Sequence, residues 1–348
     1  MKLLLPLLAL LAAMPIALAA PRETMILKDG WKFQRGAAED AQKIDFDDSS
    51  WEDVKVPHDW AITGPFDKEV DKQTVRITQN QEKEATEKTG RTGALPHIGE
   101  GWYRTRFRLP ELTEEQRVLI QFEGAMSRPV VHVNGKEVGR WNYGYAYFHF
   151  DITDAVKSGD ENLLAVHLTN DGLSSRWYPG AGLYRKVQVI IKNRESFDHW
   201  GTFITTPDAT AGQATVKIQT RFTGEKLQLK TAILGPDGKL VARKDSSDAK
   251  DGGFTQDIMV RNPKLWSPES PHLYQAVMRL YDGNEVKDEQ TIRFGIRTVS
   301  YTKERGFELN GKNRKFKGVC LHHDLGPIGA AVNKAALRRQ LEIMKEMG

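Results

Sequence analysis

The sequence has few of the features that mark common chemical sites in proteins. Its 348 residues include one cysteine, Cys320, so no disulfide bond can form within the chain. It has no phosphate-binding loop, dinucleotide fingerprint, nucleophile elbow or zinc-binding spacing. The net charge is only +4, and the basic residues are scattered. These absences predict no metal and no cofactor, and they argue against a nucleic acid or a membrane surface as partner.

A long apolar run occurs only at the N-terminus. Residues 3–18 are apolar, and positions 17–19 have the small-x-small sequence ALA. This pattern predicts a secretory signal peptide over residues 1–19, and hence a periplasmic or secreted protein without membrane attachment after cleavage. The alternative is a transmembrane anchor, which is disfavoured because Pro15 interrupts the run.

Residues 25–195 have the pattern of an all-β domain. In residues 101–109, apolar residues and threonine alternate with arginines, which predicts a half-buried strand with one solvated face. Asn134-Gly135 predicts a hairpin turn. Short strands at this spacing favour a sandwich of jelly-roll type. Residues 67–100 interrupt the pattern with a long polar stretch, which is either a functional loop or an insert without a role.

Residues 199–297 predict a second, smaller sandwich. Alternation over residues 214–221 and 273–280 indicates strands, and Pro236-Asp237-Gly238 indicates a turn between strands. The size is typical of an immunoglobulin-like domain, although the cysteine pair of antibody domains is missing. We expect this domain to act as a spacer that orients its neighbours.

The sequence KFKGVCLHHDLGPIGAA, residues 315–331, has a different character. Residues 315–321 predict a buried strand that opens into a polar loop. A helix is expected after the loop, with Asn333 as its N-cap and apolar residues at helical spacing. The chain is therefore predicted to be mainly β, with two sandwiches followed by one βα unit. Such a unit cannot bury its apolar face alone.

His322, His323 and Asp324 are the first candidates for chemistry. They follow the predicted strand, and α/β barrels place their active sites at the carboxyl ends of their strands. Because adjacent side chains of an extended segment point to opposite faces, we expect one histidine to face the site. We favour His322 as a hydrogen-bond donor to a ligand. The alternatives are histidines that only pack the strand end, or a metal site, although no further ligand cluster accompanies them.

Two further segments are candidates for ligand binding. The sequence SSRWYPGAGLYR places Arg176 and Trp177 beside a glycine-containing turn. An aromatic ring beside an arginine suits a sugar, which stacks on the ring and accepts hydrogen bonds from the guanidinium. The alternative is that Trp177 and Tyr178 close the edge of the sandwich. His58 and Asp59, in the sequence PHDW, form either an orienting pair or a capped turn.

Paired carboxylates are missing from the positions that would suit glycoside cleavage. That chemistry generally uses two, one as acid/base and one as nucleophile or base. No Asp or Glu of the sequence occupies a convincing position for either role. We therefore predict no catalytic residue within this chain.

The order of these segments resembles the N-terminal portion of glycoside hydrolase family 2, in its β-galactosidase-like branch. The sequences PHDW, GWYR, SSRWYPGAGLYR, LWSPESPHLY, FGIR and KGVCLHHDLGPIGAA follow one another across essentially the whole mature chain. The resemblance implies a jelly-roll sugar-binding domain at residues 25–195, an immunoglobulin-like domain at 199–297 and the start of a (β/α)8 barrel at 298–348. It also implies retaining hydrolysis of terminal β-galactosides, a carbohydrate partner and a homo-oligomeric full-length enzyme.

The resemblance also implies roles for residues. His322 matches the family's histidine that binds a sugar hydroxyl, and Cys320 stands where many relatives have asparagine. Arg176 and Trp177 match a segment that reaches towards the mouth of the site, and the pair His58–Asp59 is carried over with them as substrate-binding. The family's catalytic glutamates lie on later barrel strands, beyond the end of this sequence. The resemblance thus implies a glycosidase fragment that is inactive alone.

Two other functions stay open at this point. One is a non-catalytic carbohydrate-binding protein that uses the sandwiches without a barrel. The other is a β-glucuronidase, whose pattern after the same strand continues with a HED-type run, where this chain has HHDLG.

Overall fold

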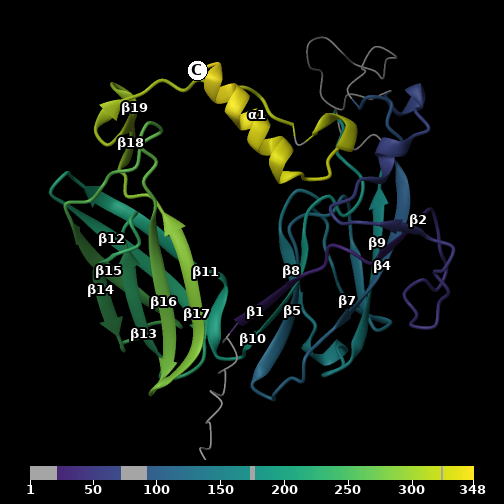
Figure 1. Ribbon diagram of the computed structural model, residues 1–348, viewed down its shortest axis with the longest axis horizontal. Coiled ribbons are helices and arrows are strands. Elements are labelled where there is room, and N and C mark those ends of the chain that lie inside the picture. Colours follow the sequence, from purple (N-terminus) through teal and green to yellow (C-terminus); the bar gives the residue numbers. More distant parts are fainter. Residues whose placement is uncertain (1–21, 72–91, 173–176, 323) are drawn as a thin grey trace, which may run out of the picture.

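Two β-lobes and a C-terminal helix make up the chain (Figure 1). The computed structural model describes residues 22–71, 92–172, 177–322 and 324–348. The predicted signal peptide, residues 1–19, lies outside the described residues. Among those described, no helix is long and apolar enough to cross a membrane. The prediction of a mainly β chain is confirmed.

The first lobe is a sandwich of two antiparallel sheets. One sheet has four strands, in the order β1 (Arg22–Ile26), β10 (Val187–Asn193), β5 (Gln116–Phe122) and β8 (Phe148–Asp151). The other has six, in the order β3 (Glu52–Val54), β2 (Trp31–Arg35), β4 (Gly99–Arg108), β9 (Glu161–Asn170), β6 (Val130–Val133) and β7 (Lys136–Arg140). Three short 3-10 helices lie in its loops: η1 (Trp60–Thr63), η2 (Lys68–Asp71) and η3 (Thr153–Ala155).

The second lobe is a smaller sandwich with its own core. One sheet has the order β11 (Ser196–Ala209), β12 (Gln213–Thr223) and β15 (Gly253–Arg261). The facing sheet has the order β14 (Leu240–Ser246), β13 (Gln228–Leu234), β16 (Tyr274–Asp282) and β17 (Glu285–Phe294). The strands predicted at residues 214–221 and 273–280 lie within β12 and β16.

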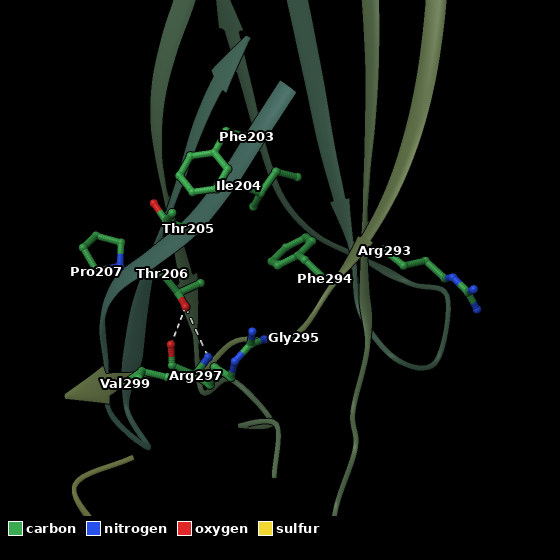
Figure 2. A pocket seen from close by; sticks show the side chains of 10 residues that line it. All are labelled: Phe203, Ile204, Thr205, Thr206, Pro207, Arg293, Phe294, Gly295, Arg297 and Val299. Atoms are coloured by element: carbon green, nitrogen blue, oxygen red, sulfur yellow. Dashed lines mark hydrogen bonds between the residues drawn. The ribbon is translucent and has the colours of Figure 1, made fainter. Parts of the chain in front are cut away.

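A groove of about 550 Å³ lies between the edge strands β11 and β17 of the second lobe (Figure 2). Thr206 is linked to Arg297 at this groove. Its hydroxyl donates to the backbone carbonyl of Arg297 and accepts from the backbone N–H of the same residue. Figure 2 shows the side chain of Arg293 pointing away from the other lining side chains. The groove is thus closed at one end by contacts within the chain, and we assign it no ligand.

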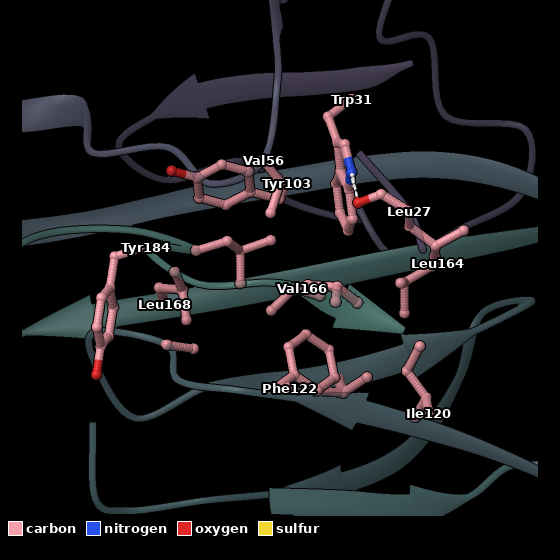
Figure 3. Packing of buried hydrophobic residues seen from close by; sticks show 14 of the residues in the cluster. Leu27, Trp31, Val56, Tyr103, Ile120, Phe122, Leu164, Val166, Leu168 and Tyr184 are labelled. Carbon is pink, nitrogen blue, oxygen red and sulfur yellow. Dashed lines mark hydrogen bonds between the residues drawn. The ribbon is translucent and has the colours of Figure 1, made fainter. Parts of the chain in front are cut away.

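Alternating side chains build the core of the first lobe (Figure 3). Tyr103 and Phe107 of β4 point inward and meet Ile120 and Phe122 of β5, all of them buried. Trp31 is fully buried as well, and its indole N–H donates to the carbonyl of Leu27 at 3.1 Å. A polar ring atom is tolerated at such depth because it has a hydrogen-bond partner. The period-2 pattern of the sequence therefore corresponds to burial on this face.

The other face of β4 is solvated only in part, since Arg106 and Arg108 are exposed as the sequence predicted but Arg104 is not. Arg104 is 1% exposed, because residues 36–51 fold over this part of the sheet. Its guanidinium donates to Asp48 at 2.6 Å and to the backbone carbonyls of Ala41, Lys43 and Phe46. A buried cation is stable here because its donors are paired. Alternation alone could not distinguish this covered arginine from a solvated one.

Asn-Gly turns close two hairpins, and the one predicted at Asn134-Gly135 is confirmed. Asn134 and Gly135 join β6 to β7 with φ angles of 51° and 84°. Asn310 and Gly311 join β19 (Gly306–Leu309) to β20 (Lys312–Asn313) with φ angles of 51° and 71°. Positive φ at both central residues defines the turn that matches the twist of paired strands, and Asn and Gly adopt it most readily.

Buried polar contacts join the two lobes. Asp288 of β17 is fully buried, and its carboxylate accepts hydrogen bonds from Arg22 of β1 at 2.7 and 3.2 Å. It also accepts one from the backbone N–H of Phe197 in β11. Asn193 of β10 donates to the carbonyl of Lys287 at 2.7 Å. These contacts fix β17 against β1 and β10 of the first sandwich and against β11 of the second.

The C-terminal segment departs from the prediction. After the small sheet of β18 (Val299–Thr302), β19 and β20, residues 315–321 form no strand. Phe316, Val319 and Leu321 are 78%, 59% and 55% exposed. A strand needs a hydrogen-bonded neighbour, and a parallel one needs cover on both faces. None of the described segments pairs with residues 315–321, so the predicted buried strand, and with it the βα unit, is wrong for this structure.

The predicted helix is present as α1 (Lys334–Glu346). The side chain of Asn333 accepts hydrogen bonds from the N–H groups of Ala335 and Ala336, so the predicted N-cap is confirmed. None of its apolar residues is fully buried, and Leu341 is 60% exposed. The helix returns from the first lobe towards the second across one end of the molecule (Figure 1).

Candidate functional site

Three segments that are far apart in the sequence meet at one end of the first lobe. They are the PHDW sequence before η1, the loop before β10 that contains Trp177 and Tyr178, and the segment around η4 (Gly326–Ile328). Asp59 accepts hydrogen bonds from Tyr178, 119 residues away, and from Ala330, 271 residues away. The structure therefore brings together the three segments that the sequence singled out separately.

Asp59 is the centre of this junction. It is fully buried, and its carboxylate accepts hydrogen bonds from the hydroxyl of Tyr178 at 2.6 Å, from Ala330 N–H at 2.7 Å and from Ala61 N–H at 3.1 Å. Burial raises the pKa of Asp59, while these hydrogen bonds act in the opposite direction. Its oxygens are fully engaged, so Asp59 holds the loops and does not face a ligand.

Gly329 lets the C-terminal segment approach that carboxylate. A side-chain carbon at position 329 would lie 2.4 Å from an oxygen of Asp59 and 2.6 Å from Ile62, and the φ angle of Gly329 is +56°. Both the contact and the backbone angle exclude larger residues. What Gly329 approaches in the structure is the carboxylate of Asp59.

Tyr178 is held as a donor. It is almost fully buried, and burial is the main cause that raises its pKa far above the ordinary value, with the charge of Asp59 acting in the same direction. The hydroxyl thus stays protonated and donates to Asp59. His97 packs edge-on against the ring, with the centroids 6.0 Å apart. The proposed alternative for Tyr178, that it closes the edge of the sandwich, describes this residue well.

His58 lies directly beside Asp59 but faces the core. Its Nδ1 is 2.7 Å from the hydroxyl of Tyr103, and its ring packs against Phe33 with the centroids 5.1 Å apart. Burial lowers the pKa of His58 to about 4. The imidazole is therefore neutral near pH 7. Of the two alternatives for PHDW, the structure shows the capped turn, because His58 contacts Tyr103 rather than Asp59 and Asp59 caps η1.

Trp177 and His322 form the exposed part of the site. Their rings lie edge to face at an angle of 74°, with the centroids 5.2 Å apart. Trp177 is 41% exposed, and His322 is exposed as well. An aromatic face beside an imidazole can stack on a sugar ring and exchange a hydrogen bond with a hydroxyl. We call this pair the Trp177–His322 face.

The remaining candidates have other places. Asp324 accepts a hydrogen bond from the N–H of Gly326 at 2.6 Å and thereby shapes the turn into η4. Its negative charge also contributes to the raised pKa of Tyr178, so it lies within electrostatic reach of the junction. Arg176 and His323 lie outside the described residues.

The sequence did not predict the hydrogen bonds to backbone carbonyls that hold the junction together. Asn170 is buried, and its side-chain amide donates to the carbonyls of His97 and Gly180. Those two bonds hold the loop that contains Tyr178 and Gly180 next to the segment that contains His97. No pattern in the sequence predicted these bonds, because contacts to backbone carbonyls leave no pattern of their own.

The two described carboxylates of the junction, Asp59 and Asp324, are engaged in contacts within the chain. Glycoside hydrolysis needs two carboxyl groups that can reach the substrate. Asp59 is buried under its donors and Asp324 caps a turn. Within the described part of the chain, no cluster of three or more His, Cys, Asp or Glu could hold a metal ion.

His58 gives the junction a testable dependence on pH. The unfolded chain takes up a proton near the ordinary histidine pKa of 6.5, but the folded protein does so only near pH 4. Protonation therefore favours unfolding, and the free energy of unfolding should fall as the pH drops from 6.5 to 4, by at most about 1.4 kcal/mol per pH unit. In His58→Gln this contribution should be absent, while that of His199, whose pKa burial also lowers to about 4, should remain. Urea unfolding at several pH values between 4 and 7.5 measures it.

The neighbouring Asp59 contributes with the opposite sign, because its folded pKa is raised. That contribution is present in both proteins, so the difference between them isolates His58. Parallel curves for the two proteins would contradict the assignment.

Two family models match this chain. The one described as "Glycosyl hydrolases family 2, sugar binding domain" matches residues 26–194. The one described as "Glycosyl hydrolases family 2" matches residues 200–297. The first range spans the first sandwich, and the second spans most of the second sandwich.

Two related proteins match this chain across both lobes. The beta-galactosidase BoGH2A of Bacteroides ovatus is 35% identical over 342 residues, which are 95% of this chain and 38% of that protein. A putative beta-glucuronidase of Formosa agariphila is 37% identical over 324 residues, or 92% of this chain and 29% of that protein.

Solved structures of glycosidases also resemble this chain. A glycosyl hydrolase family 2 member from Bacteroides cellulosilyticus superposes with a TM-score of 0.82 at 35% identity, covering 93% of this chain and 42% of that one. Beta-glucuronidase 2 of Bacteroides uniformis gives a TM-score of 0.77 at 29% identity, covering 94% and 39%. The chain thus spans less than half the length of these relatives.

Proposed function

The chain belongs to glycosyl hydrolase family 2, and on that premise we propose that it supplies the sugar-binding wall of an exported retaining glycosidase. The Trp177–His322 face carries this proposal, because an exposed indole and an imidazole meet there from two segments that Asp59 ties together. The substrate we propose is a terminal β-galactoside of an oligo- or polysaccharide, bound by stacking on Trp177 and by a hydrogen bond with His322. We place the protein in the periplasm or outside the cell, on the strength of its predicted signal peptide.

We propose that the 348-residue chain does not hydrolyse glycosides by itself. The described carboxylates at the junction are engaged in holding loops, so the acid/base and the nucleophile would come from residues outside this sequence. The exposed apolar residues of the C-terminal segment, Phe316, Val319, Leu321 and Leu341, favour further protein that covers them.

Activity measurements test this part of the proposal. The purified chain should release no nitrophenol from 4-nitrophenyl β-galactoside above the buffer rate. A saturable rate that scales with protein concentration would contradict it. The same sequence extended by a (β/α)8 barrel should become active on the same substrate.

Binding measurements test the face itself. We expect galactose to bind the chain with a dissociation constant in the millimolar range, and His322→Ala and Trp177→Ala each to weaken this by roughly tenfold, or about 1.4 kcal/mol. His272→Ala and Tyr301→Ala are matched controls in the second half of the chain and should bind as the parent does. Titration followed by NMR of the histidine ring protons measures all five proteins. Unchanged affinity in His322→Ala and Trp177→Ala would exclude this face as the sugar site.

A β-glucuronide is the second candidate substrate, because the putative beta-glucuronidase of Formosa agariphila is the more identical of the two curated relatives described. The same titration with glucuronate in place of galactose separates the two. Tighter binding of glucuronate, lost in His322→Ala, would favour the second candidate.

A further inference from the structure

Trp200 has an unusual conformation that the fold alone does not explain. It lies in β11 at a break in the pairing with β12, between Phe197 and Thr202. Its φ angle is +55°, although residues with large side chains rarely adopt the left-handed region. Such a backbone conformation is strained. Bulges of this kind redirect a side chain, and here the redirected ring is 60% exposed.

The redirected ring meets an aromatic residue of the other lobe. Tyr147, in the loop between β7 and β8, packs against Trp200 at an angle of 86° with the ring centroids 4.8 Å apart. Tyr147 is 38% exposed. On the far side of this pair, Trp200 contacts His199, and His199 contacts His149 of β8 with centroids 4.1 Å apart. We call Tyr147 and Trp200 the aromatic shelf.

Polar groups accompany the shelf. Glu123 and Arg185 lie within electrostatic reach of Tyr147, since burial and then the charge of Glu123 raise the pKa of that tyrosine while the charge of Arg185 lowers it. Glu123 accepts a hydrogen bond from Gln188 at 3.0 Å. Arg185 has a buried Nε without a hydrogen-bond partner. One carboxylate and one guanidinium thus lie near the exposed rings, and Lys186 lies 3.8 Å from the same carboxylate.

We propose that the aromatic shelf is a second carbohydrate-binding site, which holds neutral sugar units of a polysaccharide away from the Trp177–His322 face. The apolar face of a pyranose stacks on an exposed ring, and carboxylate or guanidinium groups at its rim exchange hydrogen bonds with hydroxyls. This inference rests on the proposed function for the kind of ligand, and on Trp200 and Tyr147 for its place.

The size of the shelf favours a sugar over a protein partner. The two partly exposed rings offer on the order of 200 Å² of aromatic surface. A stable protein interface buries roughly 1,200 Å² or more. Two rings suffice, however, for one or two sugar units of a longer chain, whose repeated units then add to retention.

Affinity electrophoresis of the full 348-residue chain tests the shelf. Native gels containing galactomannan, arabinogalactan or pectic galactan are compared with gels that contain no polysaccharide. We expect at least one of the three to retard the chain. Trp200→Asn and Tyr147→Ala should raise the dissociation constant at least fivefold, whereas the controls His272→Ala and Tyr301→Ala should leave the retardation unchanged.

The choice of variants separates loss of the ring from loss of the fold. Asparagine tolerates positive φ, so Trp200→Asn removes the indole without a new backbone conflict. Trp200→Tyr keeps an aromatic ring and should keep most of the retardation. The urea midpoint of each variant is measured in parallel.

Three results would overturn the proposal. They are retardation of Trp200→Asn equal to that of the parent, absence of retardation of the parent by all three polysaccharides, and loss of retardation in His322→Ala together with Trp177→Ala. Failure of the proposed function is distinguishable from these, because it would appear as unchanged galactose binding in the His322 and Trp177 variants while the shelf still retards the chain.

Discussion

Replacing Asp59 with alanine is expected to lower the free energy of unfolding by about 3–5 kcal/mol, since three buried donors lose their acceptor at once. The donors are the hydroxyl of Tyr178 and the N–H groups of Ala61 and Ala330. Asp59 is fully buried, so its donors are shielded from bulk solvent. Urea unfolding at pH 7 measures the loss.

Hydrogen exchange shows where the loss acts. The N–H of Ala330 bonds to Asp59, and the N–H of Val332 bonds to the carbonyl of Tyr184, so both should exchange faster in Asp59→Ala. Amides in the second lobe, such as Val216 in β12, should exchange at the parent rate, because that lobe has its own hydrophobic core. We therefore expect the C-terminal segment to detach from the first lobe before either sandwich unfolds.

Two variants serve as controls for Asp59→Ala. Tyr178→Phe removes one donor and leaves the other two paired, so it should cost about 1–2 kcal/mol. Asp53→Ala removes an exposed carboxylate that pairs with Lys32, and its effect should lie within about 0.5 kcal/mol. Equal losses in Asp53→Ala and Asp59→Ala would contradict the role given to the junction.

Local patterns predicted the elements whose partners are near in sequence. The Asn134-Gly135 turn and the Asn333 cap depend on residues within a few positions, and both are found in the structure. Alternation along residues 101–109 predicted the buried face of β4, because the side-chain period of a strand is two. Such signals need no knowledge of the rest of the fold.

Predictions failed where a distant segment decides the outcome. Arg104 reads as a solvated residue until residues 36–51 are known to cover it. Residues 315–321 have the composition of a buried strand, yet none of the described strands lies beside them. The candidate segments around Asp59, Trp177 and His322 were each recognised, but their meeting depends on bonds that span 119 and 271 residues. The composition of a segment does not show that it contacts a residue so far away in the sequence.

The second large effect is expected at Asp288, where the two lobes meet. Asp288→Ala is expected to lower the free energy of unfolding by about 3–4 kcal/mol, because it leaves the Arg22 guanidinium and the buried N–H of Phe197 without their acceptor. The matched control is Glu289→Ala, one residue along β17, which removes an exposed pair with Arg279. A pair of that kind contributes about 0.2–1 kcal/mol. Urea unfolding compares the two variants.

The same variant also tests what orients the lobes. If Arg22 and Asp288 fix β17 against β1, Asp288→Ala should increase the radius of gyration in small-angle scattering, while Glu289→Ala should not. The contact of Tyr147 with Trp200 crosses the same boundary, so the tryptophan emission of Asp288→Ala should shift to longer wavelength as that indole loses its neighbour. A loss of stability without either change would assign Asp288 to the second sandwich alone. The lobes would then be held together by the remaining contacts, among them the bond from Asn193 to Lys287.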